Sequence, residues 1–388
     1  MDASYNYEFL AHPKIISGKC SLENIPAELA GYDAQKPLVI ARKSIVQQEG
    51  ITKKFVRAFA DSMVVLGAVY DEVENYAGIS KAREAAFLFT ERGCDSLIAL
   101  GSGAAVDLAK AVNVLVSEKA DNLSAFYEGK AIDDILKPLL FVPAGRTNGR
   151  ESSNTMIIDN REIKSDFLYP EVIVIDPRMT SVCRSDDVAE SAAIAFAQSF
   201  AVFAAKKHNP MTAAVAHPAL SYLSQYLEQG LKRPKNKSTS IALTNASVVA
   251  SIAYDNTRPG TTNLLAEELA RATDLSVGVV TGMLLPSVIE LMGKKEFPVS
   301  DELLLAIGGL DVYAAVAPQD RARKGLEAAL KLARVLLSFL PASLKELNVQ
   351  KYIFNEVARA VAQKCDDIFS ENDFAQILEA AWGRRREY

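Results

Sequence analysis

The sequence predicts an α/β domain followed by an all-helical domain. Three observations lead to this prediction: short runs of Val, Ile and Leu in the first half, helical patterns between several of them, and helical periodicity without strand-like runs after about residue 187. Continuous apolar runs are typical of parallel strands buried on both faces, and their alternation with helices indicates βαβ units. We therefore expect an α/β domain with a parallel sheet over residues 1–180 and an all-helical domain over residues 181–388.

Strands and helices alternate in the first part. The runs that predict buried strands are residues 37–41, 63–69, 96–100, 139–142 and 172–176. The helical patterns between them cover residues 50–62, 79–92 and 107–117. In the second part, apolar residues recur three and four positions apart, as on one face of a helix. The segments with this pattern are residues 187–206, 212–229, 238–254, 262–273, 277–292, 319–340 and 348–365.

Composition excludes several classes of protein. The chain has 388 residues, of which 49% are hydrophobic and 23% charged, so disorder is not expected. A net charge of -5 gives no general electrostatic footprint for nucleic acid. The four cysteines are scattered without a C-x-x-C pair, which favours a reduced, cytoplasmic protein. We recognise no signal peptide and no apolar run long enough for a transmembrane helix, so no membrane partner is expected.

The strongest local feature is a glycine-containing turn between a buried strand and a helix. The run Asp95–Lys110 passes from the strand into Gly101-Ser-Gly103 and then into a helical pattern. Glycine permits close backbone approach, and a helix N-terminus offers N–H groups and partial positive charge to a phosphate. Val106 stands where the dinucleotide fingerprint G-x-G-x-x-G has its third glycine, so an ordinary strand-to-helix turn remains an alternative.

With these residues the sequence resembles the iron-containing alcohol dehydrogenase family, whose relatives include glycerol dehydrogenase and dehydroquinate synthase. The family motif G-G-G-S-x-x-D-x-A-K aligns with Gly101–Lys110. Further family landmarks align with residues 16–22, 142–151, 169–180, 209–212, 253–256 and 284–286. The resemblance implies a dinucleotide-binding parallel sheet, an NAD(P)-dependent oxidoreductase, a small-molecule substrate and a homodimer.

The resemblance also implies which residues bind the dinucleotide. Gly101, Ser102, Gly103 and Asp107 match the loop that holds the pyrophosphate, although Asp107 could equally complement the helix dipole. The family loop P-T-T-A-G-T-G-S-E lines the nicotinamide side, and it is matched here by Pro143–Glu151, which includes Thr147 and Asn148.

A basic residue replaces an acidic family residue after the first predicted strand. The family has V-T-D there, whose Asp favours NAD over NADP, whereas this chain has Arg42 followed by Lys43 and Ser44. An arginine can bind a 2′-phosphate through two hydrogen bonds, so we expect NAD or NADP as cofactor, with NADP at least tolerated. A solvated basic loop is the alternative.

The metal ligands of the family are not conserved in this chain. The family binds iron or zinc through one Asp and three His, and the matching positions are Ile194, Gln198, Asn263 and Val277. A further family His becomes Glu267. Hydrocarbon and amide side chains are poor ligands for iron or zinc, so we expect no metal. The chain has only three histidines, His12, His208 and His217, and none stands at a ligand position.

Without a metal, another group must stabilise the oxygen of the alcohol or carbonyl. Arginines can donate charge-assisted hydrogen bonds to it, and we take Arg146, Arg258 and Glu267 as catalytic candidates. Two arginines in the nicotinamide loop, Arg146 and Arg150, could also bind an anionic substrate, although they could equally turn to solvent or pair with nearby acids. We therefore expect hydride transfer between a nicotinamide and a small alcohol, aldehyde or keto substrate. A non-catalytic relative that keeps the fold is the alternative, and a lyase like dehydroquinate synthase is a weaker one.

Overall fold

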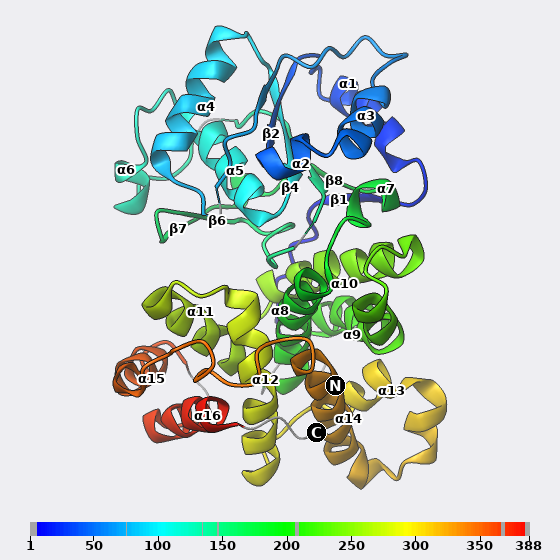
Figure 1. Ribbon diagram of the computed structural model, residues 1–388, viewed down its shortest axis with the longest axis vertical. Helices are drawn as coiled ribbons and strands as arrows, with labels where there is room; N and C mark the ends of the chain where they lie inside the picture. Colours follow the sequence, from blue (N-terminus) through cyan, green and yellow to red (C-terminus); the bar gives the residue numbers. More distant parts are fainter. Residues whose placement is uncertain are drawn as a thin grey trace. The chain divides into compact units, whose positions relative to one another are not determined.

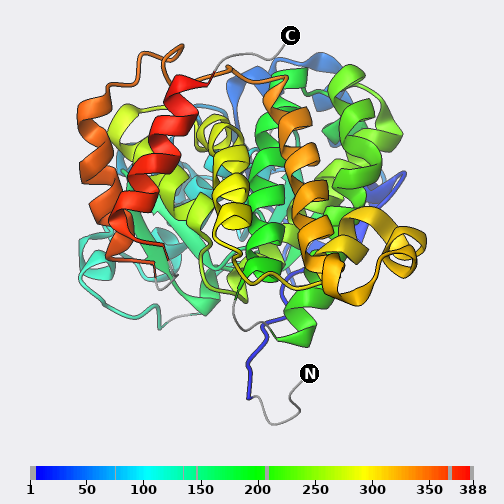
Figure 2. The same ribbon diagram turned by 90° about the horizontal axis from the view of Figure 1, so that it is seen from below.

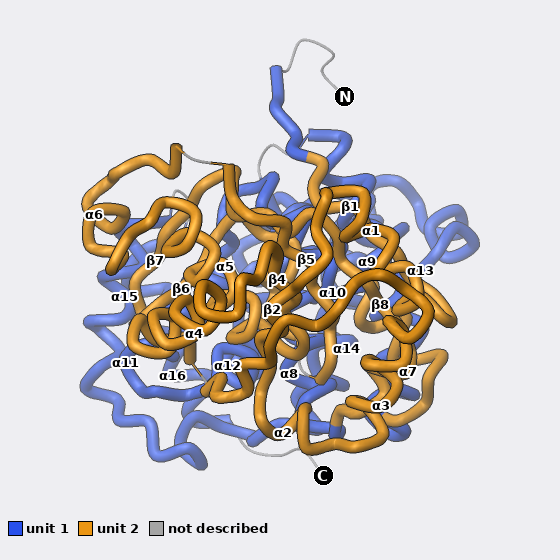
Figure 3. Tube along the Cα trace, turned by 90° about the horizontal axis from the view of Figure 1, so that it is seen from above, with its two compact units in different colours: residues 1–10, 184–234, 246–388 blue, residues 11–183, 235–245 orange. Residues whose placement is uncertain are grey.

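The computed structural model describes residues 6–74, 76–133, 135–145, 147–205, 209–365 and 369–384. The chain divides into two compact units (Figure 3). Unit 2 comprises residues 11–183 and 235–245, and unit 1 comprises residues 1–10, 184–234 and 246–388. The expected single boundary after residue 180 differs from this division, because the chain returns to unit 2 for residues 235–245, which include the first half of one long helix.

Unit 2 contains a six-stranded sheet whose strands are all parallel, as the apolar runs predict. The order across the sheet is β1-β8-β5-β4-β2-β3. Strands β2, β4, β5 and β8 are buried along their whole length, which explains why they are continuously apolar. The strands are β1 (Lys14–Ser17), β2 (Pro37–Ala41), β3 (Ala68–Tyr70), β4 (Ser96–Gly101), β5 (Leu139–Pro143) and β8 (Val172–Ile175).

Helices cover both faces of this sheet (Figure 1). Alternate residues of β2, β4, β5 and β8, such as Val39 and Ile98, form one apolar cluster with residues of α1 and α3. Helix α5 packs on β2, β4 and β5, and α4 packs beside α5. The helices of unit 2 are α1 (Ile25–Gly31), α2 (Lys43–Val46), α3 (Glu49–Arg57), α4 (Ile79–Glu91), α5 (Gly103–Ser117), α6 (Ser124–Tyr127) and α7 (Pro177–Thr180), with 3-10 turns at Ser21–Asn24 and Asp166–Leu168.

Three parts of unit 2 differ from the sequence-based expectation. The apolar run at residues 63–69 is strand only from Ala68 onward, because Met63 and Val65 lie exposed before the edge strand β3. The sheet gains β1, which is too short and too exposed to be recognised from its sequence. A separate hairpin also forms from β6 (Thr155–Ile158) and β7 (Arg161–Lys164), which pair in antiparallel register.

The strand order fixes where a ligand is expected. From β2 the chain continues to its neighbour β3 on one side, whereas from β4 it continues to β5 on the other side. Connections therefore diverge between β2 and β4, and doubly wound sheets bind ligands outside the carboxyl ends of the strands at such a switch point. The residues at these two ends are Ala41–Arg42 and Gly101–Gly103, because Ala41 pairs with Leu100 in register.

The described residues of unit 1 form helices joined by irregular segments and contain no strand, as predicted. Helix α8 packs against α9, α11, α12, α13 and α14 and is the central helix of the unit; Figure 2 shows α8 in green with α12 in yellow and α14 in orange around it. The helices are α8 (Ser185–Ala204), α9 (Pro210–Lys232), α10 (Lys237–Asp255), α11 (Thr261–Thr273), α12 (Val277–Lys294), α13 (Glu302–Ala315), α14 (Arg321–Leu337), α15 (Phe354–Ala362) and α16 (Glu371–Gly383), with 3-10 turns at Pro318–Asp320 and Lys351–Ile353; the first half of α10 belongs to unit 2.

Two of these helices are long and apolar enough to cross a membrane by composition alone. They are α8 and α12, and 89% and 67% of their most apolar stretches are buried inside the protein. Core helices of globular proteins have the same length and composition, so these two helices are weak evidence for a membrane span. None of the four cysteines, all of which lie within the described residues, forms a disulfide bond, and two of them, Cys94 and Cys183, are buried.

Candidate functional site

The glycine turn predicted from the sequence lies at the switch point of the unit 2 sheet. Gly101 ends β4 with a φ of +138°, a conformation that side chains with a Cβ rarely adopt. Ser102 is the N-cap of α5 but its side chain makes no capping hydrogen bond. The first turn of α5 therefore presents its backbone N–H groups without a side-chain cap from Ser102, as an anion site at a helix N-terminus requires.

A second loop folds over this turn. A Cβ on Gly103 would lie only 1.7 Å from the side-chain nitrogen of Asn148, so the absence of a side chain at Gly103 lets Asn148 lie directly over the start of α5. The Asn148 side-chain oxygen accepts a hydrogen bond from the Arg150 backbone N–H at 3.1 Å, which holds it in this position. The structure thus brings Gly103 and Asn148 together, although they are 45 positions apart in the sequence.

A buried carboxylate holds the second loop in shape. Glu151 is fully buried, and its two oxygens accept hydrogen bonds from the backbone N–H groups of Asn148, at 2.5 Å, and Gly149, at 2.9 Å. Burial raises the pKa of Glu151, although these N–H groups and the charge of Arg150 act in the opposite direction. Glu151 is therefore a positioning residue for the loop over the glycine turn.

Two charged groups of α5 are buried behind the turn. The Asp107 carboxylate, 2% exposed, accepts a hydrogen bond from the Arg150 guanidinium at 2.8 Å, and its other oxygen has no hydrogen-bond partner. The Lys110 ammonium is fully buried and donates to the carbonyl oxygens of Ser153 and Thr155 at 2.7 and 2.8 Å. Asp107 and Lys110, which match the family motif, thus tie α5 to the loop and hairpin that follow β5.

The basic residues after β2 lie on the other side of the switch point. Arg42 donates a hydrogen bond to the backbone oxygen of Glu74 at 3.0 Å, and Lys43 lies 3.5 Å from the carboxylate of Glu72. Arg42 and Glu72 also pair through their backbones. Acidic residues of the segment after β3 therefore stand beside the two cations for which the sequence predicts a 2′-phosphate, and the tolerance of NADP stays a prediction.

Of the two remaining predicted residues of unit 2, Thr147 and Arg146, the structure describes only Thr147. Thr147 is buried, with 4% of its surface exposed, in the loop over the glycine turn. Arg146, a catalytic candidate from the sequence, lies outside the described residues. The sequence reasoning did not identify Glu72 or Glu74 as neighbours of Arg42. The signal for them is the fold itself, since the carboxyl ends of adjacent parallel strands lie together.

The second set of predicted positions lies in unit 1, where α11 and α12 begin against α8. A Cβ on Gly260, the N-cap of α11, would lie 2.7 Å from the Cβ of Ala201. A Cβ on Gly278, in the first turn of α12, would lie 2.7 Å from the Cβ of Glu190. We call the face of α8 between these two contacts the α8 strip; it carries Ile194 and Gln198 and is about 16 Å long at 1.5 Å per residue.

Asn263 and Val277 stand in the first turns of the two helices that meet the α8 strip. Val277 is the first residue of α12, and Asn263 is the third of α11. The Asn263 side chain folds back toward the start of its helix, since its oxygen lies 3.4 Å from where a Cβ of Gly260 would be. Asn263 is 6% exposed, and this oxygen has no hydrogen-bond partner. The four positions that match the family's metal ligands are thus gathered on three mutually packed helices.

These four side chains do not fit a transition metal. Ile194 and Val277 have no donor atom, and the amides of Gln198 and Asn263 are poor ligands for iron or zinc. Within the residues that the structure describes, no group of three or more His, Cys, Asp and Glu side chains is placed to hold a metal ion. The chemistry of the donor set therefore disagrees with the metal that the resemblance implies.

The two catalytic candidates that the sequence predicts in unit 1, Glu267 and Arg258, are both exposed. Glu267 is exposed on α11, one turn after Asn263, and Arg258 is exposed in the segment between α10 and α11. In the structure Glu190 is 8% exposed and accepts a short hydrogen bond from the Ser276 hydroxyl, so it serves the N-terminus of α12.

The two histidines that the structure describes, His12 and His217, lie at neither site. His12 stacks on Tyr169 with ring centroids 5.1 Å apart, and His217 is partly buried on α9. His208 lies outside the described residues.

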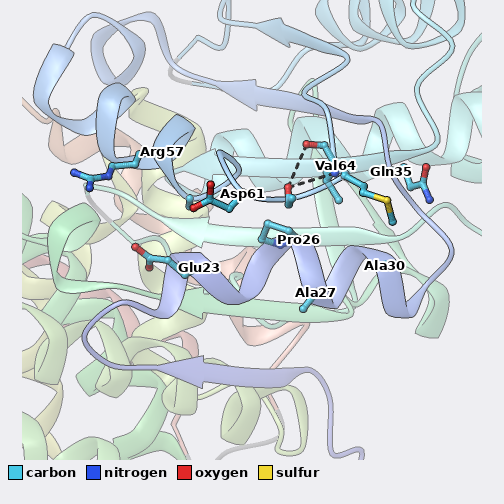
Figure 4. A pocket seen from close by; sticks show the side chains of 11 residues that line it. Glu23, Pro26, Ala27, Ala30, Gln35, Arg57, Asp61 and Val64 are labelled. Carbon is cyan, nitrogen blue, oxygen red and sulfur yellow. Dashed lines mark hydrogen bonds between the residues drawn. The ribbon is translucent and has the colours of Figure 1, made fainter.

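A separate pocket of about 460 Å³ lies in unit 2 between α1, the end of α3 and the segment that follows it (Figure 4). Arg57, Asp61 and Glu23 lie toward one end and Gln35 toward the other, and the Ser62 hydroxyl fixes the adjoining turn by donating to the Phe59 carbonyl at 2.9 Å. The lining residues include none of the glycine turn, so this pocket is not the predicted dinucleotide site. Its lining is Glu23, Pro26, Ala27, Ala30, Gln35, Arg57, Ala58, Asp61, Ser62, Met63 and Val64.

Comparison with known protein families agrees with this arrangement. The family model described as iron-containing alcohol dehydrogenase matches residues 12–177, and the model for the C-terminal part of the Fe-containing alcohol dehydrogenase family matches residues 189–381. A 4-hydroxybutyrate dehydrogenase of Cupriavidus necator is 25% identical over 390 aligned positions, which cover 96% of this chain and 98% of that protein.

Solved structures with a similar fold include two that cover nearly the whole chain. A 1,3-propanediol oxidoreductase superposes with a TM-score of 0.85 at 19% identity, covering 97% of this chain and 100% of the other. A sulfoacetaldehyde reductase from Bifidobacterium kashiwanohense in complex with NAD+ superposes with a TM-score of 0.83 at 17% identity, covering 98% and 100%. At this level of identity these likenesses establish the fold, with its α/β and helical parts.

Proposed function

The chain belongs to the iron-containing alcohol dehydrogenase family, and we propose that it transfers a hydride between a nicotinamide dinucleotide and a small anionic alcohol or aldehyde without the metal of that family. The main support for dinucleotide binding is the turn at Gly101–Gly103. This turn lies at the switch point of a doubly wound sheet and leads into the long helix α5. The bound dinucleotide would supply the hydride acceptor or donor.

The residues around this turn support the binding of a pyrophosphate. Gly101 and Gly103 permit close approach of the phosphates, and the N-terminus of α5 favours their negative charge. Asn148 lies over the same helix start and is held there by Arg150 and Glu151. We therefore propose Ser102, Asn148 and Thr147 as further contacts of the dinucleotide. The acidic neighbours of Arg42 support NAD rather than NADP, because a 2′-phosphate would stand near Glu72.

Two observations support an anionic substrate. Arg150 carries a guanidinium that is 27% exposed and is oriented by the buried Asp107, and a fixed guanidinium matches the geometry of a carboxylate or sulfonate. Two of the similar proteins are a 4-hydroxybutyrate dehydrogenase and a sulfoacetaldehyde reductase, whose substrates each carry an acidic group. We propose a short alcohol or aldehyde that carries such a group at its far end.

The proposal is tested by titrating the purified protein with NADH and then assaying NAD-dependent oxidation of 4-hydroxybutyrate and 1,3-propanediol, with and without a chelator. We expect saturable NADH binding, turnover that survives chelation, and a lower KM for 4-hydroxybutyrate. Arg150→Lys keeps the charge but loses the fork, and we expect it to raise the KM for the carboxylate about tenfold while leaving that for the diol within about twofold.

Other results would point elsewhere. Saturable NADH binding without turnover of any alcohol or aldehyde would indicate a non-catalytic relative that keeps the dinucleotide site. Activity that is lost on chelation and restored by iron or zinc would contradict the metal-free part of the proposal. The homodimer expected from the family stays a prediction, which light scattering of the purified protein tests.

A further inference from the structure

We propose that Asn263 and the N-terminus of α11 bind the reacting oxygen of the substrate at the place where relatives hold a metal. This inference rests on the proposed function. It assigns a specific group to the positions at which this chain lacks the metal ligands of the family. The argument uses only unit 1, because all of the residues concerned belong to α8, α11 and α12.

The first observation is a buried acceptor without a donor. The side-chain oxygen of Asn263 has no hydrogen-bond partner, and the residue is 6% exposed. Leaving a buried amide oxygen unpaired costs about 1 to 3 kcal/mol, so such an atom needs an explanation, and one explanation is a ligand that completes it. The group that completes an acceptor must donate, and the hydroxyl of an alcohol is such a donor.

The second observation is the place where α11 begins. Gly260 is its N-cap, so no side chain caps the helix from that position, and the close contact of Gly260 with Ala201 fixes the helix start against α8. Gln198 lies one turn from Ala201 on the same helix, and it is 4% exposed. The helix start, the Asn263 amide and the α8 strip therefore adjoin one another.

The two helices that start at the α8 strip differ in charge compensation. At α12 the carboxylate of Glu190 accepts from Ser276, the N-cap, and so complements the positive end of the helix. At α11 the N-cap is a glycine. The partial positive charge of α11 is thus the one suited to an oxygen that gains negative charge as its proton leaves or, in the reverse reaction, as hydride is added to the carbonyl carbon.

The arrangement accounts for the reaction without a metal. The carbon of the alcohol gives its hydride to the oxidised dinucleotide, and the hydroxyl proton leaves to solvent, which yields the carbonyl, the reduced dinucleotide and one proton. Asn263 takes neither electrons nor the proton. It orients the hydroxyl by accepting its hydrogen bond, and the start of α11 stabilises the charge that develops on the oxygen.

The test compares Asn263→Leu, which has a similar volume and no amide, with Ser199→Ala as the matched control. Ser199 is fully buried on α8 and its hydroxyl also lacks a partner, but it is not on the face that carries Ile194 and Gln198. With 4-hydroxybutyrate as substrate we expect Asn263→Leu to lower kcat about 100-fold and to leave the Kd for NADH within about twofold. Ser199→Ala should keep kcat/KM within about twofold.

Each outcome decides one of the two proposals. If the wild type does not bind NADH, the proposed function fails. If NADH binds and Asn263→Leu keeps its kcat/KM within threefold, only the present inference fails. If Asn263→Leu does not fold, Asn263→Ser is measured instead, and a loss of less than fivefold in kcat/KM overturns the inference.

Two further measurements do not depend on turnover. In the presence of NADH, 4-hydroxybutyrate should raise the Tm of the wild type and of Ser199→Ala but not of Asn263→Leu; an equal rise in all three contradicts the role of Asn263. Metal analysis of protein expressed in iron- and zinc-supplemented medium should find well below one metal ion per chain. A stoichiometric ion that is lost in Asn263→Leu would show that the amide is a ligand and would overturn the inference.

Discussion

The start of α5 in unit 2 and the start of α11 in unit 1 are both helix N-termini whose N-caps make no side-chain hydrogen bond. At α5 most residues of the family motif are retained, and a loop 45 positions away packs over Gly103 through the side chain of Asn148. At α11 and the adjoining α8 strip the fold is retained but the ligands are replaced by Ile, Gln, Asn and Val. The backbone geometry of a site can thus be retained where the side chains that act there in the family are replaced.

The comparison has a physical reason. A phosphate site at a helix N-terminus uses backbone N–H groups, which survive any substitution that preserves the turn. A metal site uses side-chain donors, and each substitution removes one of them. The following predictions test how far each region depends on its side chains.

The largest effect is expected from Gly103→Ala, because the new Cβ would lie 1.7 Å from the Asn148 side-chain nitrogen. Either Asn148 leaves the start of α5 or the turn shifts, and in both cases the phosphate site is lost. We expect the Kd for NADH to rise at least about 100-fold, which corresponds to about 2.7 kcal/mol. Fluorescence titration with NADH measures this change.

Two variants control that experiment. Gly50→Ala lies on α3, where a Cβ would meet no atom within 4 Å, and should bind NADH like the wild type. Gly103→Ala combined with Asn148→Ala should regain thermal stability but not affinity. Full recovery of affinity in the double variant would mean that neither residue contacts the dinucleotide.

A smaller effect is expected from Arg150→Leu, which leaves the Asp107 carboxylate without its partner. Asp107 is 2% exposed, so its charge would be poorly solvated. We expect the free energy of unfolding to fall by about 2 kcal/mol, measured by urea denaturation. Lys324→Ala breaks an ion pair with Glu327 whose side chains are 44% and 50% exposed, and it should change stability by less than about 0.5 kcal/mol. Equal effects in the two variants would show that the Asp107–Arg150 pair does not stabilise unit 2.

A carboxylate at the amino end of β8, in the same sheet, should make the stability of the protein depend on pH. Glu171 accepts a hydrogen bond from the Leu139 backbone N–H at 2.6 Å, and burial raises the pKa of Glu171 from 4.5 to about 7. The folded chain therefore holds this proton more tightly than the unfolded chain, and the stability contributed by Glu171 is lost as the pH rises from about 4.5 to 7.

Glu171→Gln should remove this pH dependence, since it stays neutral and keeps an acceptor for Leu139. Between pH 5 and pH 8 we expect the wild type to lose roughly 2 kcal/mol of unfolding free energy relative to Glu171→Gln. Urea denaturation at the two pH values measures it. Parallel curves for the two proteins would contradict a raised pKa.

The smallest effect is expected in the core of unit 1, from Ser199→Ala. The Ser199 hydroxyl is buried without a partner, so its removal should raise the free energy of unfolding by about 0.5 to 1 kcal/mol. Thr212→Val removes a buried hydroxyl that does donate, to the Asn256 carbonyl at 3.2 Å, and should lower stability by about 1 kcal/mol. Thermal melts of both variants give the sign; a loss in Ser199→Ala would indicate that its hydroxyl has a solvent partner.

The parallel sheet and the helices of unit 1 could be predicted because burial imposes recognisable periods on the sequence. Strands such as β8 are apolar throughout, and helices such as α11 were located to within one residue at each end. The hairpin of β6 and β7 was not predicted, although its turn residues Asp159 and Asn160, with φ of +50° and +59°, are a recognisable signal. Helices α13 and α16 were also missed; in α13 a non-helical Gly309 interrupts the periodicity.

The candidate site could be predicted only where it depends on local sequence. The glycine turn is contiguous, so a pattern of ten residues locates it. The position of Asn148 over Gly103, the bond between Arg150 and Asp107, and the meeting of Gly260 with Ala201 all join segments far apart in the chain. No short pattern carries such contacts, because they follow from how helices and loops pack around the sheet.

The buried ammonium of Lys110 has a practical consequence. Its nitrogen donates to two carbonyl oxygens and is fully buried, whereas every other lysine that the structure describes is at least partly exposed. An amine-acylating reagent can therefore reach it only when the contact between α5 and the β6 segment opens, and the rate of that single modification, followed by mass spectrometry, reports how often this part of the protein opens. The acylation rate of this one lysine would thus report the opening of the region behind the glycine turn, and a bound dinucleotide should lower that rate.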